Sequence, residues 1–556
     1  MRSRTDRGRL PAFILSAAML AAFISPAAAQ TAAPARPVAD QLRESITVQS
    51  IADSTKALAA PEMEGRGTGQ PGGEKAANWI AEKFKALGMK PLGDKGSYLQ
   101  KVGFTETVID PATSFSAGDT MLEYGKDFAF MPRTGDRRAS GDIVFVGYAI
   151  QGKAAGIDQL ADVDIAGKFV AMIEGPPPGF SKEIWKKQKL QRAIMRNLYS
   201  KGPAGIITFS RGDEEQTEDQ AVDYFSRRQV SLGGESKNLP EGAPVFVSMT
   251  AKGIEKVFAA AGMTREKAIE LAGDPKFRGK DLKVKAKAIS KLTTSKVTAY
   301  NVVGLIEGSD PNLSKEAVLF SAHYDAYGKL NGSIYAGAAD NALGTAEMLS
   351  VAEAYTKLGR KPKRSMIFLA VTGEEYGLLG SKYWAKEPTW DIKKVAADLN
   401  LDGIGSEVYG PVKTIVGYGA EHSTLGPMLD SVARSLDLNV IPDPMPDEKV
   451  FYRSDHYSFV ERGVPSLMLL GAPAGEKEIW IKRIKEWEKG DYHQPGDTVK
   501  DTWAWEGAET VAEVMAILGW QIAEDEQMPS WLKTSRFSKY DRGNSKPIPE
   551  DESEEQ

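Results

Sequence analysis

The sequence predicts an α/β fold, in which a mostly parallel mixed sheet is covered by helices and a second, mainly β domain is inserted. Strand-like apolar runs alternate with helical segments from residue 297 onward, and such alternation is typical of a parallel sheet with helices on both faces. Between residues 131 and 291, short apolar runs are separated by loops rich in Gly, Pro and charged residues. The chain of 556 residues is too long for one core, at roughly 150 residues per domain.

The first 40 residues are expected to precede the folded part of the chain. Four arginines come before an apolar stretch at residues 12–24, and small residues follow it, which is the pattern of a secretory signal peptide over residues 1–29. A membrane-spanning helix needs about 20 apolar residues, so the pattern favours cleavage over a permanent anchor. Residues 30–40 are rich in Ala and Pro and are expected to form a disordered leader.

Residues 41–130 are assigned to the first part of the main domain, and residues 131–291 to the insertion. A turn-dense loop at residues 64–73 leads into residues 74–89, where apolar side chains recur at helical spacing, so an amphipathic helix is expected there. Inside the insertion we expect strands and two helices. The expected strands are 143–150, 169–173, 204–209 and 245–249, and the expected helices are 186–201 and 252–261.

Residues 292–530 are predicted to form the catalytic part of the main domain, and residues 531–556 an acidic, mobile tail. The expected strands are 317–322, 366–371, 395–401, 412–416 and 466–470. The expected helices are 342–358, 378–384, 422–436 and 503–523.

The composition excludes several classes of protein. With 42% hydrophobic and 26% charged residues, the chain is an ordinary globular one. Its net charge of -5 and the lack of a basic run give no reason to expect nucleic acid as a partner. No cysteine is present, so a metal site would have to use His, Asp and Glu.

Two of the four histidines lie in sequence contexts that suit a site. His323 follows the strand predicted at 317–322, and the carboxyl ends of parallel strands are where α/β sheets bind ligands. Asp325, two residues later, is a natural hydrogen-bond partner that would orient the imidazole. His493 stands in a loop before the last long helix. A single histidine near a strand end is more often structural than metal-binding.

Carboxylates follow the neighbouring strands. Asp340 lies in a loop of small residues, which would let two metals share it, although an N-cap explains it equally well. Glu374 and Glu375 repel one another after a strand and therefore favour a nearby cation, unless they are an exposed helix start. Asp402 comes after the strand at 395–401. The pattern as a whole, rather than any single residue, predicts a site.

Two histidines and three carboxylates, one of them shared, give each of two cations three protein ligands and an open position. The predicted ligands are His323, Asp340, Glu375, Asp402 and His493. Nitrogen and oxygen donors without sulfur suit Zn²⁺, and Co²⁺ or Mn²⁺ also fit. Glu374 is left free to take a proton as general base.

These motifs resemble the clan MH zinc exopeptidases, which include secreted bacterial leucyl-type aminopeptidases, plasma glutamate carboxypeptidase and transferrin-receptor relatives. The matching residues are Glu64-Gly-Arg-Gly-Thr-Gly69, His323-x-Asp325, Asp340-Asn341, Glu374-Glu375, Asn400-Leu-Asp402 and Tyr492-His493. The resemblance implies a zinc-exopeptidase, phosphorylase/hydrolase-like fold. It also implies that the insertion is a protease-associated domain, because residues 163–168 and 201–207 look like that domain.

The resemblance also implies roles for single residues. Asp340 would bridge two zinc ions, with His323 and Asp402 completing one site and Glu375 and His493 the other. Glu374 would be the general base and Asp325 would orient His323. Tyr492 would stabilise the oxyanion, with Tyr418 as a rival, and His456 would be structural or line the pocket.

We therefore expect an exported zinc aminopeptidase that removes N-terminal residues from peptides, located in the periplasm or secreted. Two alternatives stay open. The first is a carboxypeptidase or dipeptidase of the same clan, and the second is a receptor-like binding protein without catalysis. No stable membrane insertion is expected after signal cleavage, and the sequence carries no signal for an oligomeric state.

Overall fold

A computed structural model describes residues 36–131, 134–151, 158–181, 185, 189–212, 218–233, 242–403, 408, 410–473, 477–546 and 548. The predicted signal peptide lies outside these residues. Helix α1 (Val38–Ser45) begins inside the stretch predicted as a disordered leader, and Leu42 of this helix is buried, so the leader prediction is wrong from residue 38. Within the described ranges, no helix is both long and apolar enough to cross a membrane.

The main lobe is built on one sheet of ten strands within the described residues. Its centre is the parallel array β20 (Ser466–Pro473), β17 (Val395–Asn400), β13 (Ala317–His323) and β16 (Ser365–Val371). The flanking pairs β18·β20, β12·β16 and β12·β2 are antiparallel. The predicted α/β sheet is confirmed, with its parallel part at the centre.

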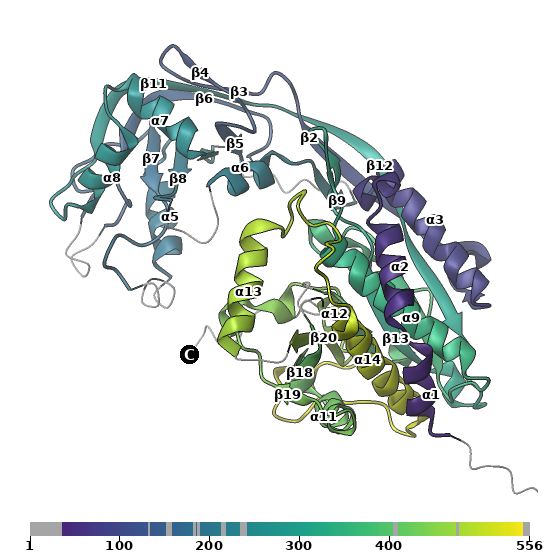
Figure 1. The fold of residues 1–556 in the computed structure, drawn as a ribbon. Helices are drawn as coiled ribbons and strands as arrows, with labels where there is room; N and C mark the ends of the chain where they lie inside the picture. The colour runs from purple at the N-terminus through teal and green to yellow at the C-terminus, as the bar shows by residue number, and fades with distance from the viewer. Residues whose placement is uncertain are drawn as a thin grey trace, which may run out of the picture.

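Helices cover both faces of this sheet (Figure 1). Because side chains alternate along a strand, Val318 and Phe320 of β13 pack in one core cluster and Leu319 packs in another. The first cluster includes residues of α9 (Leu343–Lys357) and α14 (Glu506–Glu524), and the second includes Trp384 of α10 (Leu379–Lys386). The main lobe is thus a three-layer structure.

The remaining elements of the main lobe complete these layers. The helices are α2 (Val48–Leu58), α3 (Pro71–Ala86), α11 (Leu425–Ser435), α12 (His456–Val460) and α13 (Lys477–Gly490). The other strands of the ten-stranded sheet are β1 (Lys90–Pro91), β2 (Leu99–Ile109), β9 (Gln229–Leu232), β12 (Leu292–Ile306), β18 (Val412–Tyr418) and β19 (Asn439–Ile441). A separate two-stranded sheet is formed by β14 (Gly328–Leu330) and β15 (Ser333–Tyr335).

The inserted lobe has its own sheet of eight strands within the described residues. The order is β4-β3-β11-β6-β7-β8-β10-β5, and helices α5, α7 and α8 add their buried residues to its core cluster. The strands are β3 (Ser114–Ala117), β4 (Thr120–Leu122), β5 (Phe128–Phe130), β6 (Arg137–Phe145), β7 (Phe169–Ile173), β8 (Gly205–Phe209), β10 (Val245–Met249) and β11 (Lys280–Ser290). The helices are α5 (Leu190–Ser200), α6 (Glu218–Ser226), α7 (Ala251–Ala260) and α8 (Arg265–Gly273).

The second sheet begins at Ser114, whereas the sequence analysis placed the boundary at residue 131. Strands β3, β4 and β5 belong to this sheet because β3 pairs with β11 and β5 pairs with β10. The change of sheet therefore falls just after β2, near residue 110.

Long strands run between the two lobes (Figure 1). β2 and β12 pair antiparallel from Leu99–Val302 to Ile109–Leu292. β9, which lies within the insertion in sequence, pairs with β2 through Phe104 and Leu232 at the edge of the main sheet. The insertion is thus joined to the main sheet by three adjacent strands.

The start of the predicted mobile tail is packed on the main lobe. Phe537 is buried, and Arg542 donates hydrogen bonds of 2.8 Å to the carbonyl oxygens of Val395 and Ala396. The prediction of a mobile tail is wrong for residues 531–546, and the acidic residues beyond them all lie outside the described residues.

Candidate active site

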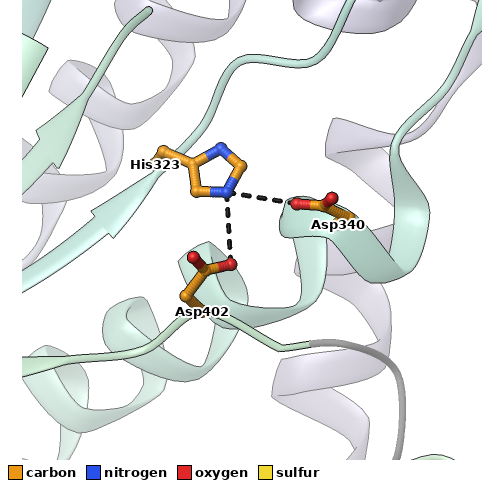
Figure 2. A group of neighbouring side chains, drawn as sticks. All are labelled: His323, Asp340 and Asp402. Atoms are coloured by element: carbon orange, nitrogen blue, oxygen red, sulfur yellow. Dashed lines mark hydrogen bonds and ion pairs between the residues drawn. The ribbon is translucent and has the colours of Figure 1, made fainter. Parts of the chain in front are cut away.

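Asp340 lies between two histidines that are far apart in the sequence. Its Oδ1 atom is 3.2 Å from Nε2 of His323, and its Oδ2 atom is 3.3 Å from Nε2 of His493. Figure 2 shows the first half of this arrangement, with His323 between Asp340 and Asp402. A single carboxylate therefore presents one oxygen to each imidazole.

Two groups of donors meet at this carboxylate. His323, Asp340 and Asp402 form one group, and Asp340, Glu375 and His493 form the other, each with ligand atoms within 4.8 Å of one another. In the first group, Nε2 of His323 is 3.2 Å from Oδ1 of Asp402. In the second, Nε2 of His493 is 3.0 Å from Oε2 of Glu375. The structure brings together all five residues that the sequence analysis selected as ligands.

The parallel strands explain why three of these residues meet. His323 is the last residue of β13, Asp402 follows β17, and Glu375 follows β16. β13 pairs with both of the other strands. Because the carboxyl ends of parallel strands share one edge of the sheet, the three side chains arrive at the same place.

Asp340 lies at this edge because its loop packs closely against the loop that carries Asp402. Asn341 donates to the carbonyl oxygen of Leu401 at 3.0 Å, and its side-chain oxygen accepts the backbone N–H of Gly403 at 3.2 Å. A Cβ at Gly344 would lie 2.4 Å from the same Leu401 oxygen, so only glycine permits this contact. Asn341 and Gly344 thus hold the loop of Asp340 against the loop of Asp402.

Two charged residues that the sequence analysis left without a role support the same loop. Asp497 accepts the backbone N–H groups of Ala339 at 2.8 Å and Asp340 at 3.0 Å. Arg66 is fully buried, and its guanidinium donates to the carbonyl oxygens of Ala336 at 2.6 Å and Gly337 at 2.7 Å. Arg66 stood in the Glu64–Gly69 motif quoted above, but only the folded contacts reveal what Arg66 and Asp497 hold.

Asp325 contacts His323 differently from the prediction. Nδ1 of His323 lies 3.2 Å from the backbone carbonyl oxygen of Asp325 and 3.8 Å from its carboxylate. The carboxylate instead accepts the hydroxyl of Thr68 at 2.9 Å and the backbone N–H of Glu374 at 3.2 Å. The main chain of Asp325 therefore orients the imidazole, while its side chain fixes the loop that carries Glu374.

The site concentrates negative charge in a buried place. Burial raises the pKa of Glu374 well above its usual range, and the charges of Asp402 and Asp455 add to this while His323 opposes it. Burial lowers the pKa of His493, but the charge of Glu375 and the contact with Asp340 outweigh it and set that pKa at about 9. Such crowding of carboxylates favours a bound cation.

A small cavity of about 50 Å³ adjoins Asp340, Glu374 and Asp402. Its wall includes Tyr492, whose ring stacks on His493 at 3.7 Å between centroids. The hydroxyl of Tyr492 accepts a hydrogen bond of 3.3 Å from Arg453. The cavity beside the donors is therefore small and partly enclosed, and the phenol ring of Tyr492 borders it.

Two further residues raised by the sequence analysis lie away from this cavity. Tyr418 is 3% exposed and packs in an apolar cluster with Phe451 and Met468, so its ring is part of the core. His456 is fully buried with its ring 5.3 Å from that of Phe451, and burial lowers its pKa to about 3. His456 belongs to neither group of donors in the described residues, as expected for a structural histidine.

A cleft of about 1090 Å³ opens next to His493 and Tyr492. Residues of α6 from the inserted lobe and of α13 from the main lobe form its walls, and Gln220 of α6 donates to the carbonyl oxygen of Lys489 at 2.6 Å. The insertion therefore borders the approach to the site.

Comparison with known proteins finds a family model that matches the part of the chain that holds these features. Residues 301–518 match the sequence model of peptidase family M28. The probable leucine aminopeptidase 2 of Aspergillus oryzae is 29% identical over 218 residues, which is 36% of this chain and 40% of that protein. The chain thus spans less than half of the length of this curated relative.

Solved structures share the fold over most of the chain. The aminopeptidase from Aneurinibacillus sp. strain AM-1 has a TM-score of 0.56 and 19% identity, covering 88% of this chain and 97% of that one. A zinc aminopeptidase from Bacillus subtilis has a TM-score of 0.51 and 16% identity, covering 87% and 96%. The chain is thus similar to peptidase family M28 over residues 301–518, which include all five clustered donors and Glu374.

Proposed function

We propose that this protein is an exported exopeptidase with two zinc ions, and that it acts as an aminopeptidase on peptides. The observation that carries the proposal is the position of Asp340, whose two oxygens each face a different histidine at 3.2 and 3.3 Å. A carboxylate placed in this way could serve both ions of a two-metal hydrolytic site. The site residues would be His323 and Asp402 around one ion, Glu375 and His493 around the other, and Asp340 between them.

The donors suit zinc in number and kind. Each group offers one imidazole nitrogen and two carboxylates, which leaves an open position on a four-coordinate ion. Oε2 of Glu375 is buried, and apart from Nε2 of His493 at 3.0 Å it has no hydrogen-bond partner within the described part of the chain, which suits a cation ligand. Zinc is named for the Bacillus subtilis relative, and Co²⁺ or Mn²⁺ would suit the same donors.

When bound, such a pair of ions polarises the scissile carbonyl and lowers the pKa of water. The protein's own contribution begins with Glu374, which lines the cavity and lies 3.9 Å from Nε2 of His323. Its raised pKa suits a group that accepts a proton from the attacking water and returns it to the leaving amine. Asp325 holds the backbone of Glu374 in place, and Tyr492 provides a hydroxyl for the developing oxyanion.

Two observations favour an exopeptidase. The cavity at the donors is about 50 Å³, which admits little more than the end of a chain. The cleft that leads to it is bordered by α6 of the inserted lobe, so the insertion limits the approach of a long polypeptide. We propose that this insertion is a protease-associated domain and that the chain is exported through residues 1–29.

The experiment is to purify the protein, measure its zinc content and test peptides with one end blocked. An aminopeptidase with two ions would hydrolyse amino-acid arylamides and peptides amidated at the carboxyl end, but not peptides acetylated at the amino end. Cleavage of the acetylated peptides alone would instead identify a carboxypeptidase. A preparation that binds no metal and hydrolyses neither set would leave only the receptor-like alternative.

A further inference from the structure

Arg227 lies in a charged segment of the insertion, yet its side chain is buried in the main lobe. The residue is 4% exposed and follows directly after α6 (Glu218–Ser226). Its Nη2 atom donates to the backbone carbonyl oxygen of His493 at 2.6 Å and to Oδ2 of Asp223 at 2.6 Å. A residue of the insertion therefore contacts a proposed metal ligand directly.

Two tyrosines enclose the same guanidinium. Its central carbon lies 4.2 Å from the ring centroid of Tyr327 and 4.7 Å from that of Tyr335, at which distance the cation is attracted to both rings. The hydroxyl of Tyr335 reaches Asp223 at 3.3 Å. Arg227, Asp223 and the two tyrosines thus form one cluster, which joins α6 to the main lobe.

This cluster contacts His493 at its Nδ1 atom and at its backbone carbonyl oxygen. Nε2 of His493 faces Asp340 and Glu375, its Nδ1 atom lies 3.4 Å from the hydroxyl of Tyr327, and its carbonyl oxygen accepts from Arg227. The backbone of His493 has a φ of 56°. A non-glycine residue in this left-handed region is strained, and it persists only where its neighbours hold it.

The next residue, Arg228, is connected through Thr68 to Asp325, on the His323 side of the site. Arg228 donates to the carbonyl oxygen of Thr68 and pairs with Glu106, and the hydroxyl of Thr68 in turn donates to Asp325 at 2.9 Å. Two consecutive arginines of the insertion therefore reach the loops on both sides of the donor cluster.

We propose that Arg227 is a positioning residue that holds His493 in its metal-binding conformation, so that docking of α6 and metal binding at Glu375 and His493 strengthen each other. The inference rests on the proposed function. Partners that orient a metal ligand typically contribute 10–100-fold to metal affinity. Because coupling between two binding events is reciprocal, removing the metal must in turn loosen α6.

The test compares three variants by zinc titration against a competing chelator, with zinc content measured on the same samples. Arg227→Met removes the donors and the charge, and Arg227→Lys keeps the charge but loses the fork that reaches His493 and Asp223 together. Arg196→Met, on the exposed face of α5 in the same lobe, is the matched control. Thermal unfolding shows which variants fold.

In Arg227→Met, we expect the affinity for one of the two zinc ions to fall about 10–100-fold relative to the wild type. The affinity should fall by a smaller factor in Arg227→Lys and should stay at the wild-type value in Arg196→Met. Excess zinc should restore kcat in both Arg227 variants. In the wild type, chelation should speed hydrogen exchange of the α6 amides. Wild-type affinity for both ions in whichever Arg227 variant folds would overturn the inference. A wild-type protein that binds fewer than two ions would overturn the proposed function itself.

Discussion

The carboxylate of Asp497 accepts the backbone N–H of Asp340 at 3.0 Å. Since Asp340 faces both histidines, this hydrogen bond fixes the residue on which both halves of the site depend. We expect Asp497→Ala to weaken zinc binding about 10–100-fold, because the loop loses two buried hydrogen bonds. Zinc titration measures this, and Asp501→Ala, at an exposed position nearby, should bind zinc like the wild type. Equal zinc affinities in the two variants would show that the loop of Asp340 keeps its position without Asp497.

Glu374→Gln tests the general base. The amide keeps the size of the side chain but cannot accept the proton, so kcat should fall about 10²–10⁴-fold while both zinc ions stay bound. Steady-state kinetics with zinc analysis on the same sample checks both parts. The control is Glu387→Gln, which changes an exposed glutamate and should leave kcat unchanged. Full activity in Glu374→Gln would remove Glu374 from the mechanism.

A pair of tyrosine variants separates the two candidates for oxyanion stabilisation. Tyr492 borders the cavity, whereas Tyr418 packs in the core. Tyr492→Phe should therefore lower kcat by up to about 10²–10³-fold, the usual effect of losing such a donor, and Tyr418→Phe should leave kcat unchanged. Steady-state kinetics on an arylamide substrate decides between them, and the reverse order of effects would assign the role to Tyr418.

Metal binding should depend on pH through His493. In the metal-free protein its pKa is raised to about 9, so its ring holds a proton at neutral pH, and a metal needs the neutral ring. Zinc affinity should therefore rise with pH up to about 9, with release of protons that calorimetry in two buffers detects.

The same pKa has the opposite effect on the metal-free fold. A group whose pKa is raised on folding stabilises the protein below its unfolded value, near 6.5, and this stabilisation is lost as the pH approaches about 9. Thermal unfolding of the chelated protein at pH 6.5 and 9 checks the direction. A metal affinity that does not change with pH would contradict the raised pKa.

Arg66 should matter for stability more than for chemistry. Its buried guanidinium also donates to the carbonyl oxygen of Leu58 at 2.9 Å, in addition to those of Ala336 and Gly337. Arg66→Met removes the guanidinium donor from these oxygens, of which only that of Gly337 keeps a second donor among the described residues, the backbone N–H of Ala342 at 3.1 Å. Hydrogen bonds to a charged group contribute about 1.5–3 kcal/mol each. We expect a loss of at least about 3 kcal/mol of unfolding free energy, measured by urea denaturation. Arg192→Met, on an exposed face of α5, should change it little.

Three of the five clustered donors could be predicted from the sequence because each follows an apolar strand. His323, Glu375 and Asp402 each follow an apolar run, and runs of that kind pair with their carboxyl ends together. Asp340 and His493 come from loops, so their approach depends on Asn341, Asp497 and other buried contacts that no spacing in the sequence encodes.

The insertion was predicted less well. Strands β3 and β5 join the second sheet through partners more than a hundred residues away, and a short apolar run does not reveal its partner. Helix α13 was missed because its buried residues, Trp480, Ile484 and Trp487, stand among charged residues. The contact of Arg227 with His493 joins residues of different lobes, which a reading along the chain cannot find.

The three strands that join the lobes have a consequence for how a substrate arrives. Swinging the insertion outward would bend β2, β9 and β12 at once and strain the backbone hydrogen bonds between them. Such an attachment resists hinge opening, so the gap before the catalytic centre should keep a nearly constant width. We therefore expect polypeptides to thread in by a loose terminus, and compactly folded proteins to pass by undigested.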